Sequence, residues 1–419
     1  MVTERQKGES YTAQNKSIHR TGRVSGKRGI EMVLTTIEWL IIVAVVVVVI
    51  LFVIKRPTRV VSFAESPLYK WNRVDLSGIV VAGDGSPYYL LTKRGKSKNV
   101  VVYFSGGGIS WDRNTASKPF GLRTLLHNRE LGYYFANIPF YKTDLLGGML
   151  DNHREDNPFY DWTIVYIPYA TGDFHIGNNK VKYKGKGKIH FTAHYSGRPN
   201  TLKGLDWLFD HITEPDKLFI AGASAGGFGS AFWAPHIAEH YPNAQIYHYA
   251  DGSYLSSHQW HHIIDEVWQS KFEQHFGYPI EEDIIAAAFR YNAQKLPANT
   301  ILLQSNTLYD KVLPSYEAVL NQQTIGLVSG DDVMTQSWSQ GMLDSAGQLD
   351  QELDNYYYFV TDYGVGTKKR STPHTLSPSR VFYTAEESGV KLSRWLGDII
   401  NKDKLYSVGK EFVESPMGK

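Results

Sequence analysis

The sequence predicts an α/β fold in which a mostly parallel central sheet is flanked by helices. Apolar runs of strand length recur along the chain, and helical patterns fall between most of them. Parallel strands need long crossover connections, so this alternation favours a parallel sheet that is covered on both faces. With 419 residues, 42% of them hydrophobic, the chain can build one core of roughly 330 residues.

The strand candidates are rich in β-branched and aromatic residues and are bounded by turn-forming residues. They are Gly78–Ala82, Tyr88–Thr92, Asn99–Phe104, Thr163–Pro168, Lys217–Ala221, Gln245–Ala250, Thr300–Gln304 and Tyr356–Val360. The segment 256–298 differs, because its apolar residues recur at helical spacing in a charged background. We expect two or three helices there to form a helical cap, or lid, over a site at the edge of the sheet.

A Gly-rich junction between a strand and a helix is the strongest motif of the chain. Gly222-Ala223-Ser224-Ala225-Gly226 follows the buried run Leu218–Ala221 and precedes a helical pattern from Gly229 to His240. In α/β-hydrolases, a G-x-S-x-G turn lifts a nucleophilic serine clear of the sheet, and small flanking residues let strand and helix approach closely. The junction therefore predicts an α/β-hydrolase fold with Ser224 as the nucleophile.

A serine hydroxyl needs a histidine base, and the histidine needs a carboxylate that orients it. In α/β-hydrolases the acid and then the histidine follow the serine along the chain. His374 lies after the last predicted strand and is the only histidine beyond His275, so we expect it to be the base. Asp310, in the loop after a later strand, is the expected acid. Asp251, at the end of the strand before that one, is the alternative.

Backbone N–H groups should form an oxyanion hole beside the serine. The loop after the third predicted strand is rich in glycine, as this role requires. We expect the amides of Gly107, Gly108 or Ile109 to act together with that of Ala225. No Lys-Ser/Thr pair follows the glycines, which argues against a phosphate-binding loop.

The N-terminal region predicts a tail and a membrane anchor. Residues 1–31 are polar and basic without periodicity, which is typical of disorder. The following residues, 32–54, are almost entirely apolar and long enough to cross a bilayer. More positive charge precedes this span than follows it, so we expect the rest of the chain to be periplasmic or extracellular. A cleaved signal peptide is the alternative.

Beyond the anchor we expect a linker at 55–70, a catalytic domain at 71–400 and a C-terminal tail at 401–419. The first 54 residues carry seven Lys/Arg and four Asp/Glu, which leaves 37 against 38 in the remainder. Such a balanced composition gives no support for nucleic-acid binding. The chain has no cysteine, which excludes a disulfide framework, a thiol nucleophile and a Cys-ligated metal.

Two further patterns carry charge or metal-ligating groups. Five lysines alternate strictly from Lys180 to Lys188 and would share one face of an extended hairpin. They indicate either a solvated strand protected from aggregation or a basic strip for a polyanion, such as a uronic-acid polymer or anionic lipid headgroups. The histidines around His190 and His258 lack a third ligand at a diagnostic spacing, so we predict no metal site.

Four elements of the chain resemble the pectin acetylesterase and Notum family of carboxylesterases. They are three glycines after a Tyr-Phe strand, Asn157-Pro158 leading to Trp162 and then Tyr166–Asp173, the run Gly222–Gly227, and Tyr309-Asp310. The resemblance covers about residues 95–380. It implies an α/β-hydrolase fold, no cofactor, and removal of acetyl or longer acyl groups from esters of a sugar polymer or protein.

The chain departs from that family at one place. Ile109-Ser110 stand where the family has Trp-Cys, so the resemblance implies no acyl-chain preference. We expect Trp111, Asp173 and His175 to contact the substrate at the mouth of the site. A serine carboxylesterase is the expected function, and the alternatives are a lipase or acyltransferase with the same triad and a membrane-anchored binding protein without turnover.

Overall fold

The computed structural model describes residues 38–44, 46–47, 57–59, 62–76, 78, 80–121, 132–138, 143, 146–185, 190–327, 332–366 and 370–414. The chain divides into two compact units, residues 1–56 and 57–419. In the first unit, residues 38–44 and 46–47 are helical. The predicted tail at 1–31 and the rest of the predicted anchor at 32–54 lie outside the described residues. No helix among the described residues is long and apolar enough to cross a membrane.

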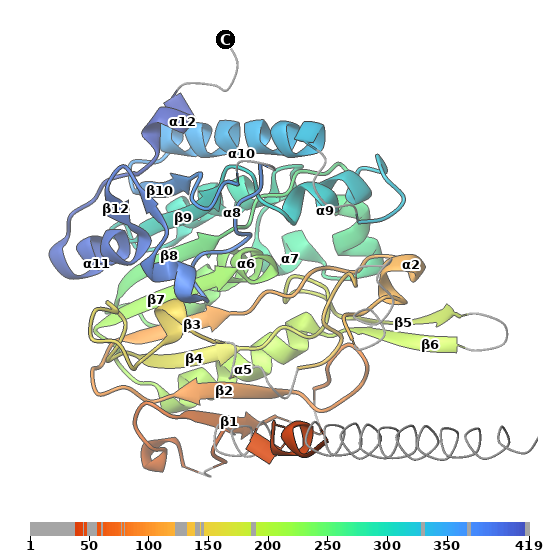
Figure 1. The fold of residues 1–419 in the computed structure, drawn as a ribbon, viewed down its shortest axis with the longest axis horizontal. Coiled ribbons are helices and arrows are strands. Elements are labelled where there is room, and N and C mark those ends of the chain that lie inside the picture. Colours follow the sequence, from red (N-terminus) through yellow and green to blue (C-terminus); the bar gives the residue numbers. More distant parts are fainter. Residues whose placement is uncertain are drawn as a thin grey trace, which may run out of the picture. The chain divides into compact units, whose positions relative to one another are not determined.

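The second unit is built on an eight-stranded sheet (Figure 1), with the order β1-β2-β4-β3-β7-β8-β9-β10. Its strands are β1 (Trp71–Asp75), β2 (Tyr89–Lys93), β3 (Val100–Phe104), β4 (Thr163–Ile167), β7 (Lys217–Ala223), β8 (Gln245–Asp251), β9 (Ile301–Thr307) and β10 (Tyr356–Thr361). Neighbours from β4 to β10 pair in parallel, and β2 alone runs antiparallel to its neighbours β1 and β4. This mostly parallel sheet confirms the α/β part of the predicted fold class.

The two faces of the sheet are covered by different helices. Along β3, Val100, Val102 and Phe104 join one core, while Val101 and Tyr103 join the other. The helices on the first face are α5 (Gly197–His211), α6 (Ala225–His240), α8 (Ile284–Lys295) and α10 (Asp332–Glu352). Those on the second face are η2 (Gly148–Leu150), η4 (Arg380–Tyr383) and α11 (Leu392–Lys402). Because both faces are covered, a central strand such as β3 is apolar along its whole length, with the sequence Val-Val-Val-Tyr-Phe.

Shorter elements complete the described part of the unit. They are η1 (Phe63–Glu65), α2 (Arg113–Ala116), β5 (Asn179–Lys184), β6 (His190–Tyr195), η3 (His262–Val267), α7 (Phe272–Phe276), α9 (Leu313–Leu320), β11 (Glu386–Glu387), β12 (Val390–Lys391) and α12 (Lys410–Glu414). The predicted strand at 78–82 is not among them, since its described residues contribute only an isolated bridge between Val81 and Pro87.

The predicted domain boundaries at 71 and 400 are too narrow. On the N-terminal side, the Thr58 N–H donates to Trp71 O at 2.9 Å, and the Tyr69 hydroxyl donates to Asp161 at 2.7 Å. On the C-terminal side, Val408 exchanges backbone hydrogen bonds with β10. The described parts of the expected linker and tail therefore belong to the folded unit, because their backbone groups are paired with its strands.

Helices form within 256–298, but they do not act as the lid that the sequence suggested. No residue of this segment lines the cavity beside Ser224. The longest of these helices, α8, instead packs against α6. Pro235 of α6 has no N–H to bond the carbonyl one turn earlier, and the Asn292 side chain of α8 donates to that carbonyl, Ala231 O, at 3.0 Å. These helices therefore belong to the layer that covers the sheet.

Candidate active site

Ser224 lies on a strained turn between β7 and α6. Its backbone has φ 55° and ψ −130°, a conformation that non-glycine residues rarely adopt. A Cβ on Gly222 would collide with the carbonyl oxygen of Gly226, and a Cβ on Gly226 would collide with that of Phe104. Only glycine fits at both positions. The turn 222–226, called the elbow below, packs directly against itself and against the end of β3.

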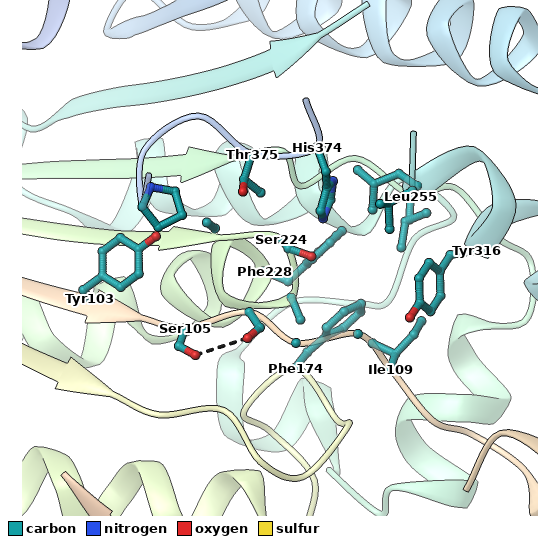
Figure 2. Close-up of a pocket in the computed structure, with 18 of the residues that line it drawn as sticks. Tyr103, Ser105, Ile109, Phe174, Ser224, Phe228, Leu255, Tyr316, His374 and Thr375 are labelled. Atoms are coloured by element: carbon teal, nitrogen blue, oxygen red, sulfur yellow. Dashed lines mark hydrogen bonds between the residues drawn. The ribbon is translucent and has the colours of Figure 1, made fainter. Parts of the chain in front are cut away.

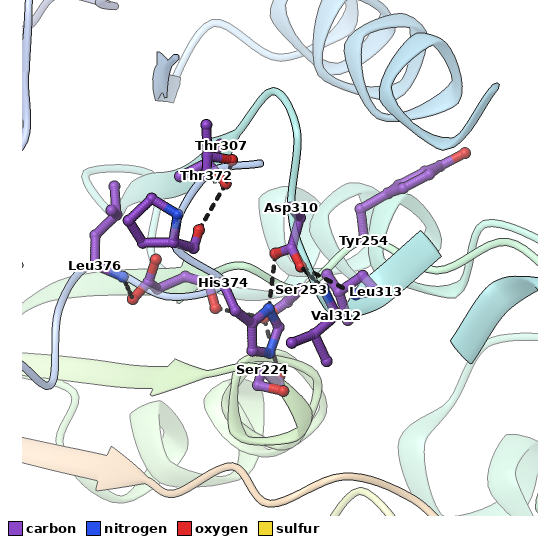
Figure 3. Close-up of polar contacts among 12 residues, drawn as sticks. Ser224, Ser253, Tyr254, Thr307, Asp310, Val312, Leu313, Thr372, His374 and Leu376 are labelled. Carbon is purple, nitrogen blue, oxygen red and sulfur yellow. Dashed lines mark hydrogen bonds and ion pairs between the residues drawn. The ribbon is translucent and has the colours of Figure 1, made fainter. Parts of the chain in front are cut away.

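His374 and Asp310 lie together above this turn (Figure 3). The Nδ1 of His374 lies 2.7 Å from Oδ2 of Asp310, and the other carboxylate oxygen accepts the N–H groups of Val312 at 2.7 Å and Leu313 at 3.0 Å. These amides open helix α9, so the carboxylate of Asp310 accepts two N–H groups that have no partner within the helix. Figure 3 shows the imidazole between Asp310 and Ser224.

The loops that carry Asp310 and His374 are bonded to each other. The N–H of Thr372 donates to Tyr309 O at 2.8 Å, and Tyr309 N–H donates to the Thr372 hydroxyl at 3.1 Å. The Thr307 hydroxyl at the end of β9 donates to Pro373 O at 2.8 Å. The relative position of Asp310 and His374 is therefore fixed by hydrogen bonds between their two loops as well as by their own contact.

Asp251, the alternative acid, holds the same loop from its other end. One of its oxygens accepts the N–H groups of Leu376 at 2.9 Å and Ser377 at 2.7 Å, together with the Ser377 hydroxyl at 2.7 Å. The other accepts the Ser305 hydroxyl at 2.8 Å. None of these bonds reaches the imidazole. Burial raises the pKa of Asp251, and these donors oppose that effect.

The glycine-rich loop after β3 lies directly beside the serine. A Cβ on Gly106 would lie 2.8 Å from the Ser224 Cβ. The amides of Gly107 and Gly108 donate to no acceptor among the described residues, and Ala225 opens α6, where N–H groups have no partner within the helix. The expectation for Ile109 is wrong, because its N–H donates to Tyr133 O at 3.0 Å.

A cavity of about 420 Å³ opens beside Ser224 and His374 (Figure 2). Figure 2 shows a mainly apolar wall on one side of the serine and Tyr103 and Thr375 on the other. The wall residues that the sequence analysis had not singled out are Phe120, Phe174, Phe228, Leu255, Val312, Leu313 and Tyr316. Only Phe228 carried a usable signal, because it follows Ser224 by one helical turn.

The expectation that Asp173 and His175 line the mouth is wrong, because both side chains are buried and neither lines the cavity. Asp173 accepts the Thr171 hydroxyl at 2.6 Å and the Gly197 N–H at 2.8 Å, and burial raises its pKa to about 6. Burial lowers the pKa of His175 to about 4, and its Nε2 lies 2.9 Å from Ser105 O. Together they fix the loop that presents Phe174 to the cavity.

Trp111 also lies away from the cavity lining. Its ring packs edge-on against Tyr133, with 5.9 Å between the ring centroids. Elsewhere in the described part of the chain, no group of three or more His, Asp or Glu side chains could hold a metal ion. His262, from the cluster noted in the sequence, instead pairs with Glu266 at 2.7 Å.

Comparisons with known proteins point to one family. A family model for pectinacetylesterase matches residues 68–278. The palmitoleoyl-protein carboxylesterase Notum of Schmidtea mediterranea is 28% identical over 135 residues, which are 32% of this chain and 23% of that protein's length. The chain therefore spans about a quarter of the curated relative that it matches.

Solved structures show a similar fold. Two crystal forms of the Wnt deacylase Notum from Drosophila superpose with TM-scores of 0.53 and 0.55, at 14% and 16% sequence identity. The superpositions cover 80% of this chain and 94% and 97% of those chains. At this identity the likeness concerns the fold alone.

The packing at the elbow predicts a strong effect of one added methyl group. Gly222→Ala should lower the free energy of unfolding by more than about 3 kcal/mol, since the collision involves backbone that cannot move aside. Gly147→Ala is the matched control, because a Cβ there meets no atom within 4 Å, and it should change stability by less than about 0.5 kcal/mol. Urea unfolding of the full chain measures both. Equal stability of the two variants would contradict the packing described for the elbow.

Proposed function

Because the chain belongs to the pectinacetylesterase family, we propose that it is a carboxylesterase that removes acyl groups by a Ser224-His374-Asp310 mechanism. One observation carries the proposal: Ser224 and His374 line one cavity, and His374 Nδ1 lies 2.7 Å from Asp310. The substrate is an acyl ester of a carbohydrate or another alcohol. Deacylation is also the activity named for the solved neighbours.

In the first step, Nε2 of His374 takes the proton of the Ser224 hydroxyl while its oxygen attacks the ester carbonyl carbon. The negative charge that develops on the carbonyl oxygen is stabilised by the N–H groups of Ala225 and of Gly107 or Gly108. Asp310 holds the imidazole in the tautomer with hydrogen on Nδ1 and stabilises its cation. When the tetrahedral intermediate collapses, the imidazolium gives its proton to the departing alcohol, which leaves an acyl-enzyme.

In the second step, water takes the place of the alcohol. His374 removes a proton from the water as it attacks the acyl carbon, and the same amides stabilise the second oxyanion. Collapse breaks the bond to Ser224, which recovers its proton from the imidazolium. The carboxylic acid leaves, and the site returns to its starting state without a cofactor.

The cavity favours acyl groups larger than acetyl. Its volume of about 420 Å³ lies within the range of small-molecule binding sites, and an acetyl group would leave most of it empty. The side chains on one side of the serine are apolar or aromatic, including Phe174, Phe228 and Leu255. Each methylene group buried against such a wall stabilises binding by about 0.8 kcal/mol.

Nitrophenyl esters of acetate, butyrate and octanoate test this function. The full chain should hydrolyse all three and react with a fluorophosphonate, with kcat/KM rising from acetate to the longer esters. Ser224→Ala should lose the labelling and at least about 10³-fold of the kcat, because the nucleophile is gone. A variant that turns over as fast as the wild type would contradict the assignment of Ser224.

A substitution in the cavity wall separates the acyl preference from the chemistry. Leu255→Phe narrows the cavity without touching Ser224, His374 or Asp310. It should lower kcat/KM for octanoate about ten-fold or more and leave acetate within about three-fold, because the loss is confined to buried methylene groups. Equal losses of kcat/KM on both esters would mean that the acyl chain binds away from Leu255.

The two carboxylates that contact the loop carrying His374, Asp310 and Asp251, are expected to differ in their roles. Asp310→Asn should lower kcat by about 10³- to 10⁴-fold, because the imidazole loses the partner that sets its tautomer. Asp251→Asn should act through the loop, with a lower unfolding temperature and a smaller loss of kcat. Ester hydrolysis and thermal unfolding, measured on both variants, distinguish these effects. A severe loss in Asp251→Asn with a mild one in Asp310→Asn would reverse the assignment of the acid.

We also propose that residues 32–54 anchor the chain in a membrane, with the folded unit on the periplasmic or extracellular side. Apolar side chains in the described helical residues support this, since Trp39 is 66% and Leu40 64% exposed. The expressed full chain should stay with membranes in alkaline carbonate and leave them only in detergent. Protease added outside intact cells or spheroplasts should cut the folded unit. Release of the protein by carbonate would contradict the anchor.

A further inference from the structure

One buried hydroxyl reaches the backbone behind the glycine-rich loop from a distant part of the chain. Tyr316 lies in α9, and its hydroxyl donates to Tyr133 O at 2.6 Å. Both side chains are buried, and their rings meet edge-on with 6.3 Å between the centroids. Figure 2 shows the Tyr316 ring pointing from α9 toward Ile109. This bond therefore ties α9 to the segment 132–135, called the backing segment below.

The backing segment holds the glycine-rich loop by two backbone hydrogen bonds. Tyr133 O, which accepts the Tyr316 hydroxyl, also accepts the N–H of Ile109 at 3.0 Å. The Phe135 N–H donates to Gly107 O at 2.9 Å. Between these two bonds, Gly108 forms an isolated antiparallel bridge with the backing segment. The position of the loop around Gly108 is therefore set by the backing segment.

The direction of one unbonded amide follows from these bonds. The carbonyl of Gly107 and the N–H of Gly108 belong to one peptide group, which is planar and trans, so they point in opposite directions. Since the carbonyl is held toward the backing segment, the Gly108 N–H points away from it and donates to no acceptor among the described residues. Gly108 lines the cavity, so this N–H is available to a substrate oxygen.

The Tyr316 hydroxyl also packs against Gly108 itself. Gly108 has φ 77°, and a Cβ there would lie 1.9 Å from Tyr133 O and 2.7 Å from the Tyr316 hydroxyl oxygen. The hydroxyl, the carbonyl and the backbone of Gly108 are therefore in close contact. A shift of the backing segment would turn the peptide groups on both sides of Gly108.

Helix α9 links this contact to the acid of the proposed triad. The N–H groups of Val312 and Leu313, at the start of the helix, donate to Asp310, and Tyr316 follows about one turn later. One short helix is therefore bound both to the acid and to the backing segment. Burial raises the pKa of Tyr316, so its hydroxyl stays protonated and remains a donor at neutral and mildly alkaline pH.

We propose that Tyr316 is a positioning residue whose hydroxyl holds the Gly108 N–H in the direction of the oxyanion. This inference rests on the proposed function, because the oxyanion forms only when Ser224 attacks an ester. Amides stabilise such a charge well only when they are preorganised. Without the hydroxyl, Tyr133 O keeps one donor, and the backing segment is held less firmly. The charge develops after the substrate has bound, so loss of the hydroxyl should lower kcat and leave KM nearly unchanged.

A role limited to the cavity wall predicts a different result. Tyr316 also lines the cavity, and its ring forms part of the apolar wall. Tyr316→Phe keeps the ring and removes only the oxygen, so it separates the two roles. If the ring alone mattered, kcat would not change. If the hydroxyl positions the loop, kcat should fall by a similar factor for short and long acyl groups.

Kinetics of Tyr316→Phe in the full chain test the proposal. For nitrophenyl acetate and butyrate, kcat should fall about ten- to hundred-fold, because the amide is misdirected and not removed, while KM stays within about two-fold. A trifluoromethyl ketone forms a tetrahedral oxyanion adduct with a serine nucleophile, so its binding should weaken by the factor by which kcat/KM falls. Titration of Ser224 with a fluorophosphonate gives the concentration of active sites and corrects for any unfolded protein.

Tyr241→Phe is the matched control. Tyr241 is as buried as Tyr316, its hydroxyl donates to Ile212 O at 3.0 Å, and it does not line the cavity. The variant loses the same kind of hydroxyl-to-carbonyl bond, so its unfolding temperature should fall by a similar amount. Its kcat, its KM and its inhibition by the ketone should stay within about two-fold of the wild type.

Three results would overturn the role of Tyr316. The kcat of Tyr316→Phe could match that of Tyr241→Phe, it could fall for butyrate alone, or it could fall without any weakening of the ketone. A wild-type chain that neither hydrolyses the esters nor reacts with the fluorophosphonate would instead contradict the proposed function, and the role of Tyr316 with it. The two failures are therefore distinguishable.

Discussion

Three stretches of backbone approach one another around Ser224 so closely that their contacts leave no room for side chains. The end of β3 meets the first turn of α6 at Gly226, that turn meets the end of β7 at Gly222, and the loop after β3 meets the serine at Gly106. Ser224 has a positive φ at this close approach, and the unbonded amides of the glycine loop lie next to its side chain. The remaining elements position the other groups of the site, such as His374 and Asp310, relative to this turn.

Two carboxylates hold one loop, and they do so by different means. Asp310 contacts the ring of His374 directly, while α9 supplies two N–H donors to its second oxygen. Asp251 accepts two N–H groups and a hydroxyl from the residues after the histidine, together with the Ser305 hydroxyl. The imidazole is therefore oriented from one side, and the peptide that carries it is tethered from the other. Gly252, next to Asp251, packs under His374 O, where a side chain would collide.

The sequence predicts the parts of this structure that depend on local patterns. The strands after residue 88, the elbow at Ser224 and the order of Asp310 and His374 each follow from neighbouring residues or from chain order. The errors concern tertiary contacts. Nothing near Ile109 in the sequence reveals that its N–H donates a hydrogen bond to Tyr133 O. The burial of Asp173 and His175 likewise depends on distant partners, Gly197 and Ser105. The helices of 256–298 are recognisable from periodicity, but the surface against which they pack is not.

The tether at Asp251 is made of hydrogen bonds in a chain that contains no cysteine. In many extracellular domains a disulfide restrains a loop of this kind, and its integrity then depends on the redox potential of the surroundings. Here the restraint is a buried carboxyl group with four donors. The geometry around His374 consequently does not depend on thiol–disulfide exchange. No disulfide has to form or be rearranged before the site can assemble.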